Sequence, residues 1–117
     1  MKLTLYQKPT CTTCREVHDI LEKSGVDFTS VDYFIKPIPK AKLKELIRKM
    51  NMSAKYLLRT NEEVYKKLKL AEKRDFLEED KLIELMVKHP DLIQRPIAEK
   101  GDKAILARPA ELIREIL

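Results

Sequence analysis

The chain has 117 residues, a length that allows one domain with its own hydrophobic core. Hydrophobic residues make up 44% of it and charged residues 37%, which is typical of a compact, helix-rich globular protein. Lysine and arginine outnumber aspartate and glutamate by 24 to 19, but most lysines alternate with glutamates and predict solvated helix faces. The sequence holds no apolar run of the roughly 20 residues that a membrane helix needs, and no nucleic-acid-binding motif. We therefore expect a cytoplasmic protein that binds neither membrane nor nucleic acid.

The first 34 residues predict a strand, a helix and a second strand. Residues 3–6 read as a short strand, and a helix is expected from near Cys11 to Ser24, where Gly25 stops it. A second run typical of a strand covers residues 28–34. Because a βαβ unit joins its strands through a helical crossover, these two strands should be parallel.

The middle of the chain, approximately residues 38–90, is predicted to be a helical insert, because its apolar residues recur at helical spacing. Thr60 and Glu63 form a plausible capping box for one of its helices. The acidic run Glu78–Asp80 should begin another helix, since negative charge is favoured at a helix start.

The last segment is predicted to return to strands and then end in a helix. Ile97 and residues 105–106 lie on either side of a turn at Gly101, which predicts a hairpin, and Pro109 should begin a terminal amphipathic helix. The predicted order is therefore βαβ, helical insert, ββα. It indicates an α/β protein with a mixed sheet of thioredoxin-like type, as a single domain over residues 1–117.

Cys11 and Cys14 form a Cys-x-x-Cys motif at the expected start of the first helix. A thiolate there faces unpaired backbone N–H groups and the positive end of the helix dipole, so its pKa should fall below the usual ~8.5. Cys14, one turn further on, can attack a sulfur adduct at Cys11. Lys8 and Arg15 add positive charge nearby. We interpret Cys11 as a nucleophile and Cys14 as the thiol that resolves its adduct.

Two other interpretations of the cysteine pair are weaker. As half of a zinc site, the pair would need two more ligands, and the only histidines are His18 and His89. His18 lies on the same helix as the pair, in a geometry that does not suit the completion of a tetrahedral site. A structural disulfide is disfavoured in the cytoplasm, and so small a loop would contribute little stability. A redox-active or nucleophilic cysteine remains the leading interpretation.

Three further blocks accompany the cysteine motif: Leu57-Leu58-Arg59-Thr60-Asn61, His89-Pro90-Asp91-Leu92-Ile93-Gln94-Arg95-Pro96-Ile97 and Ala107-Arg108-Pro109. In these blocks, and in their order and spacing over nearly its whole length, the chain resembles the glutaredoxin-coupled arsenate reductase family.

The resemblance implies a role for each matched residue. Cys11 matches the catalytic cysteine that attacks the oxyanion, and Pro96 matches a proline that is usually cis and shapes the loop facing the thiol. Three arginines match those that surround the cysteine: Arg59, Arg95 and Arg108. Physical chemistry agrees with these roles, because guanidinium forks can hold the oxygens of arsenate while a thiolate approaches. Without them the two anions would repel each other.

The chain departs from the family pattern at three positions. Cys14 stands where the family's reductases usually have serine or another residue that is not cysteine, so an internal thiol can take the step that glutathione performs. Gln7 and Lys8 stand where histidine and asparagine are common. Gln7 cannot titrate, and Lys8 could replace a histidine as a fixed positive charge.

The function that the resemblance implies is a thiol-dependent oxidoreductase acting on arsenate or a related oxyanion or thiol substrate. It implies no metal and no bound organic cofactor, with glutathione and glutaredoxin or thioredoxin as reductant, and we expect a monomer. The alternative is a redox-sensing transcription regulator of the Spx type, which shares this fold and the Cys-x-x-Cys pair and binds RNA polymerase. The arginine-containing blocks favour the reductase.

Overall fold

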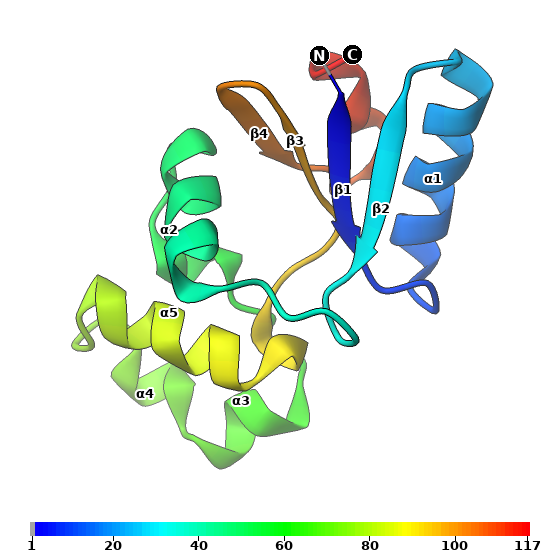
Figure 1. Cartoon of the computed structure of the whole chain (residues 1–117). Coiled ribbons are helices and arrows are strands. Elements are labelled where there is room, and N and C mark those ends of the chain that lie inside the picture. Colours follow the sequence, from blue (N-terminus) through cyan, green and yellow to red (C-terminus); the bar gives the residue numbers. More distant parts are fainter. Residues whose placement is uncertain (1) are drawn as a thin grey trace. The chain divides into compact units, whose positions relative to one another are not determined.

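The computed structural model describes residues 2–117, which divide into two compact units. The sheet unit comprises the described residues up to 37 and residues 95–117, and the helical unit comprises residues 38–94 (Figure 1). The helical unit covers the expected insert and extends to Gln94. That the chain is a single domain stays a prediction.

The sheet unit is built on four strands in the spatial order β2-β1-β3-β4. They are β1 (Leu3–Gln7), β2 (Phe28–Asp32), β3 (Ile97–Lys100) and β4 (Lys103–Leu106). β1 pairs with β2 in parallel and with β3 antiparallel, and β3 and β4 form an antiparallel hairpin. The predicted parallel pair, the hairpin and the mixed α/β fold are thereby confirmed.

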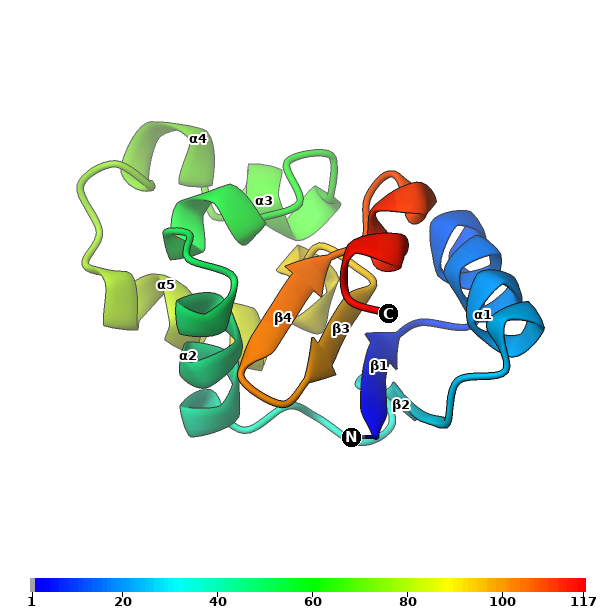
Figure 2. The same cartoon turned by 90° about the horizontal axis from the view of Figure 1, so that it is seen from above.

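Helix α1 (Thr12–Ser24) and the 3-10 helix η3 (Ala110–Glu115) pack together on the sheet. Figure 2 shows α1 beside the C-terminal segment, drawn in red. Their apolar residues share one core with the strands, and burying each large aliphatic side chain stabilises the unit by about 1.5–3 kcal/mol. The fully buried members of that core are Leu3, Leu5, Val17, Leu21, Ala98, Ala107 and Ile113.

Both ends of α1 lie where the sequence predicts them. Cys11 is the N-cap residue, with extended backbone at φ −81° and ψ 129°. Gly25 ends the helix in the left-handed conformation at φ 75°, and its N–H donates to the carbonyl of Glu22. A residue with a Cβ adopts that conformation only at a cost, which explains a glycine here.

The helical unit contains the predicted series of helices, several of them short: α2 (Lys40–Lys49), η1 (Ala54–Leu57), α3 (Glu63–Lys67), α4 (Leu70–Lys73), α5 (Glu79–Lys88) and η2 (Pro90–Leu92). The fully or almost fully buried apolar side chains of this unit include Leu43, Leu46, Leu57, Leu70, Ile83, Met86 and Leu92. A β-bridge pairs Leu58, which directly follows η1, with Ile93, which lies near the C-terminal end of the unit.

Three local predictions differ from the structure. The capping box at Thr60 is wrong, because the loop continues to Glu62 and α3 begins at Glu63 without a side-chain cap. The second strand ends at Asp32, whose carboxylate accepts the N–H of Phe34 and turns the chain. The terminal helix after Pro109 is a 3-10 helix.

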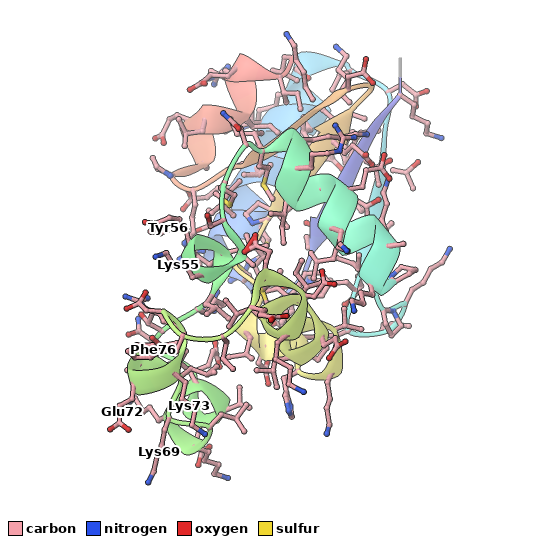
Figure 3. The ribbon with its side chains drawn as sticks, turned by 90° about the vertical axis from the view of Figure 1, so that its left-hand side faces the viewer. Lys55, Tyr56, Lys69, Glu72, Lys73 and Phe76 are labelled. Carbon is pink, nitrogen blue, oxygen red and sulfur yellow. The ribbon has the colours of Figure 1, made fainter. Side chains whose placement is uncertain are left out.

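Two aromatic side chains of the helical unit are exposed to solvent, Tyr56 at 62% and Phe76 at 87%. Figure 3 shows both pointing outward together with several lysines. Lys55 lies 5.3 Å from the centre of the Tyr56 ring and pairs with Asp75. Among the helices described, none is both long and apolar enough to cross a bilayer.

Candidate active site

The thiol of Cys11 lies at the start of α1, at the end of the loop that follows β1. Its backbone N–H donates to the carbonyl of Lys8 at 3.0 Å, which closes this loop into a tight turn. Its Sγ accepts a hydrogen bond from the backbone N–H of Cys14 at 3.4 Å. A Cys11 thiolate would therefore occupy the place where a helix start binds negative charge.

The pKa of Cys11 is lowered below that of an ordinary thiol. Partial burial alone would raise this pKa, but hydrogen bonds from the Cys14 side chain and backbone and from Arg108 outweigh it. The positive charge of Arg108 acts in the same direction. The predicted activation of Cys11 is thus supported by named contacts, with Arg108 contributing beyond the helix start.

Cys14 has the opposite character. Its side chain is fully buried, and burial is the main cause that raises its pKa to about 12. The neighbouring Cys11 sulfur raises it further, while a backbone hydrogen bond from Lys8 and the charge of Arg95 act against the rise. Both cysteines are free thiols in this structure. At neutral pH the pair therefore combines a reactive outer thiol with a protonated inner one.

Arg95 and Arg108 both belong to the sheet unit. Arg95 is only 3% exposed, and its guanidinium carbon lies 5.2 Å from the ring centre of Phe34 and 5.9 Å from that of Tyr33. Arg108 donates from Nη1 to the carbonyl of Arg95 at 3.1 Å. Arg108 therefore contacts Arg95 directly and also lowers the pKa of Cys11.

Each of these arginines precedes a proline in a cis peptide bond. The Arg95–Pro96 bond is cis, as the resemblance implies, and the Arg108–Pro109 bond, for which no cis geometry was predicted, is cis as well.

Arg59 belongs to the helical unit, where two hydrogen bonds fix it. Its backbone N–H donates to the carbonyl of Leu92 at 2.7 Å, and its Nε donates to the carboxylate of Glu62 at 3.0 Å. Its predicted place beside Cys11 stays a prediction.

Phe34 contacts two cations of the site, and sequence reasoning did not identify it as a site residue. The Lys8 ammonium lies 4.3 Å from the centre of its ring, and the Arg95 guanidinium contacts the same ring. The sequence offers only an apolar residue at the end of a strand, and no periodic signal reveals a tertiary contact with Lys8. Gln7, which like Lys8 and Cys14 departs from the family pattern, is buried at the end of β1.

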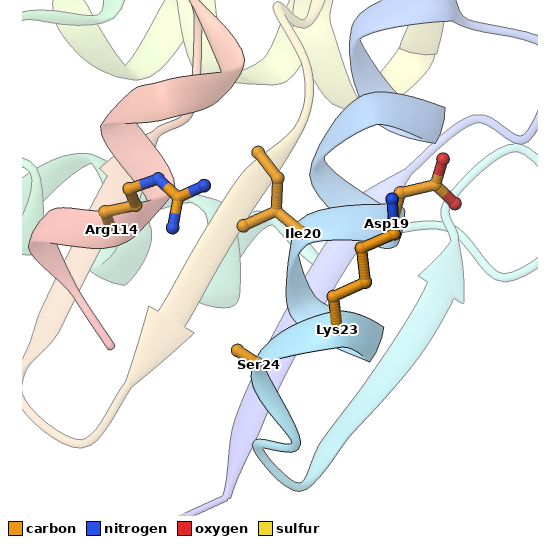
Figure 4. Close-up of a pocket in the computed structure, with 5 residues that line it drawn as sticks. All are labelled: Asp19, Ile20, Lys23, Ser24 and Arg114. Atoms are coloured by element: carbon orange, nitrogen blue, oxygen red, sulfur yellow. The ribbon is translucent and has the colours of Figure 1, made fainter.

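Two further features of the sheet unit lie away from this site. His18, Asp19 and Glu22 on α1 bring possible metal-ligand atoms within 4.8 Å of one another, and neither cysteine belongs to this group. A pocket of about 270 Å³ lies between α1 and η3, lined by Asp19, Ile20, Lys23, Ser24 and Arg114 (Figure 4). The predicted site residues do not line it.

Comparison with known proteins agrees with the sequence resemblance over nearly the whole chain. An arsenate reductase of Escherichia coli strain K12 is 39% identical over 98% of this chain and 80% of its own length. The uncharacterized protein YfgD of the same strain is 37% identical over 99% of this chain and 97% of its own length.

Comparison of structures gives the same result. A solved structure of an arsenate reductase from Vibrio cholerae superposes with a TM-score of 0.93 at 32% identity, covering 100% of this chain and 98% of that one. The model of the ArsC family matches residues 6–116, which include both cysteines and all three predicted arginines. The chain is therefore a member of the ArsC family.

Proposed function

We propose that this protein is an arsenate reductase in which the Cys11 thiolate attacks arsenic and a second thiol releases arsenite. The observation that carries the proposal is the environment of the Cys11 sulfur, which accepts a hydrogen bond from the Cys14 N–H and whose pKa is lowered by Arg108. The same groups that stabilise a thiolate can hold an oxyanion that approaches it. The named arsenate reductases among its relatives supply the choice of arsenate as the substrate.

In the first step the Cys11 sulfur forms a bond to arsenic, and one arsenate oxygen leaves as water after taking protons from solvent. The attack joins two negatively charged groups, so it needs cations that are already in place. Arg108 and Arg95 are held on the sheet unit by the contacts described above. Arg59, which belongs to the helical unit, is proposed as the third cation that binds arsenate.

In the second step a thiol attacks the Cys11 sulfur and forms a disulfide. The electrons of the sulfur–arsenic bond pass to arsenic, which leaves as arsenite in the trivalent state. Cys14 suits this role because part of the rise in its pKa comes from the neighbouring Cys11 sulfur. Once that sulfur is bound to arsenic, its negative charge is gone and Cys14 ionises more readily.

An external reductant then restores the two thiols by exchange. Cys14 is fully buried, whereas Cys11 is only half-buried. Glutaredoxin or thioredoxin would therefore attack the Cys11 sulfur and release Cys14. If glutathione forms the disulfide in the second step, the mixed disulfide is again on Cys11.

The test is arsenite production by the purified protein with arsenate and either glutathione with glutaredoxin or a thioredoxin system. We expect activity to be lost in Cys11→Ser and strongly reduced in Arg95→Ala and Arg59→Ala. Arg48→Ala is the matched control for Arg59, since both lie in the helical unit. Cys14→Ser distinguishes the reductants, because only a glutathione-dependent reaction survives without the inner thiol.

Failure of the wild-type protein to produce arsenite with either system would contradict the proposal. If Cys11 and Cys14 nevertheless form a reversible disulfide, the result would favour the redox regulator of the Spx type. Binding to RNA polymerase that depends on the oxidation state of the pair would then be the measurement to make.

A further inference from the structure

We propose that Phe34 is a positioning residue of the oxyanion site, because its ring holds the Lys8 ammonium and the Arg95 guanidinium in place. Lys8 is then a further cation that binds the substrate. This inference rests on the proposed function. It concerns two positions outside the arginines that the resemblance identifies.

The geometry of Phe34 supports this role. Its ring centre lies 4.3 Å from the Lys8 ammonium and 5.2 Å from the guanidinium carbon of Arg95. Both distances lie within the roughly 6 Å over which a cation is attracted by an aromatic ring. The Phe34 ring, in the turn after β2, therefore contacts two cations: the Lys8 ammonium, from the loop after β1, and the Arg95 guanidinium.

The Phe34 backbone is itself fixed at this position. Its N–H donates to the carboxylate of Asp32 at 3.0 Å, and the N–H groups of Ile35 and Lys36 donate to the Asp32 carbonyl. This turn begins directly at the end of β2, which is paired with β1. The backbone that carries the ring is thus anchored to the end of β2, and a side chain carried by a rigid element can position another group accurately.

Lys8 is connected to Cys11 through its backbone. Its carbonyl accepts the N–H of Cys11 at 3.0 Å, and the Lys8 backbone also acts to lower the pKa of the Cys14 thiol. The position of Lys8 is therefore fixed relative to the attacking sulfur, and contact with Phe34 restricts where its side chain can go.

The Lys8 ammonium has no carboxylate partner among the residues described. Other lysines of the chain form ion pairs with nearby acids, as Lys40 does with Glu84 at 2.9 Å. A partly buried cation without a counter-charge, placed at the cysteine loop, is suited to bind a substrate that brings its own negative charge. An aromatic ring can hold such a cation without neutralising it.

The test compares Phe34→Leu, which removes the ring, with Phe34→Tyr, which retains it. In steady-state kinetics Phe34→Leu should raise the KM for arsenate about five-fold with a smaller effect on kcat, and Phe34→Tyr should restore the wild-type value. Lys8→Met should raise KM in the same way. The double variant Lys8→Met/Phe34→Leu should raise KM by less than the product of the two single fold-changes, because both substitutions remove the same contact.

Matched controls use exposed residues of the same type. Phe76→Leu and Lys36→Met should leave KM unchanged, because Phe76 is 87% exposed and Lys36 is an exposed lysine of the same turn. If Phe34→Leu leaves KM unchanged, or if Phe34→Tyr is as impaired as Phe34→Leu, the positioning role is wrong.

A second measurement separates this inference from the proposed function. Sulfate should protect Cys11 from alkylation by iodoacetamide, and Phe34→Leu and Lys8→Met should each require several-fold more sulfate for the same protection. If the wild-type protein fails to reduce arsenate but shows this pattern, the reductase proposal fails and the anion site stands. Equal protection in the wild type and in both variants would overturn the inference.

Discussion

The backbone N–H of Cys14 donates a hydrogen bond to the Sγ of Cys11 at 3.4 Å, so the second cysteine activates the first through its main chain as well as through its thiol. A substitution of Cys14 removes only the side-chain part of this effect. Cys14 therefore acts on Cys11 in two ways that mutation can separate.

The first prediction concerns this side-chain part. Cys14→Ala should raise the pKa of Cys11, because it removes a donor to the Cys11 sulfur, whereas Cys14→Ser retains a hydroxyl donor and should shift the pKa less. The measurement is the rate of iodoacetamide reaction against pH. Identical profiles for the two variants and the wild type would show that the Cys14 thiol does not contribute.

The second prediction concerns Arg108, whose hydrogen bond and charge lower the pKa of Cys11. Arg108→Ala should raise that pKa and slow alkylation below neutral pH about three- to ten-fold. Arg114→Ala is the matched control, since Arg114 is an exposed arginine that lines the separate pocket shown in Figure 4. Equal slowing in both variants would indicate a general effect of net charge.

The third prediction follows from the raised pKa of Cys14. An ordinary thiol titrates near ~8.5, and the buried Cys14 thiol titrates at about 12. Between these values the unfolded chain releases the Cys14 proton while the folded chain keeps it. This contribution to stability is therefore complete below pH ~8.5 and is lost as pH rises toward the folded pKa.

Chemical denaturation at about pH 7, about pH 9 and about pH 11 measures this loss in the wild type and in Cys14→Ser. The free energy of unfolding should fall more steeply with pH in the wild type, since serine does not titrate in this range. Other groups, the lysines above all, are common to both proteins and cancel in the comparison. Parallel curves would contradict the prediction.

The fourth prediction concerns the core of the sheet unit. Leu21→Ala should lower the free energy of unfolding by about 2–5 kcal/mol, because it leaves a cavity beside the sheet. Phe76→Ala, in an 87% exposed side chain, should change it by less than about 0.5 kcal/mol. Denaturant midpoints of the two variants provide the measurement, and a similar loss in both would show that Phe76 is not a free surface residue.

The parts of the fold that were predictable from sequence are those with local causes. Cys11 and Gly25 end α1 at the positions expected, because a helix start and a left-handed C-cap depend on a few neighbouring residues. The hairpin around Gly101 is predictable for the same reason. The capping box at Thr60 failed because the motif competes with a loop that continues to Glu62, whose carboxylate pairs with Arg59.

The candidate site was predictable only in part. The chemistry of Cys11 follows from its place at a helix start, and the three arginines came from resemblance, since no periodicity distinguishes them from surface arginines. The contact of Phe34 with Lys8 joins residues from different loops of the sheet unit. Such a contact depends on the pairing of β1 with β2 and cannot be read from either segment alone.

The cations of this site have a consequence for selectivity. Neither Lys8 nor Arg108 is paired with a carboxylate within the region that the structure describes. Fixed positive charges recognise the shape and charge of a tetrahedral oxyanion, and in these arsenate and phosphate are closely alike. In the proposed reaction, discrimination then occurs at the sulfur, because a thiol reduces pentavalent arsenic but not pentavalent phosphorus. Phosphate should therefore act as a competitive inhibitor that lowers the rate without being consumed.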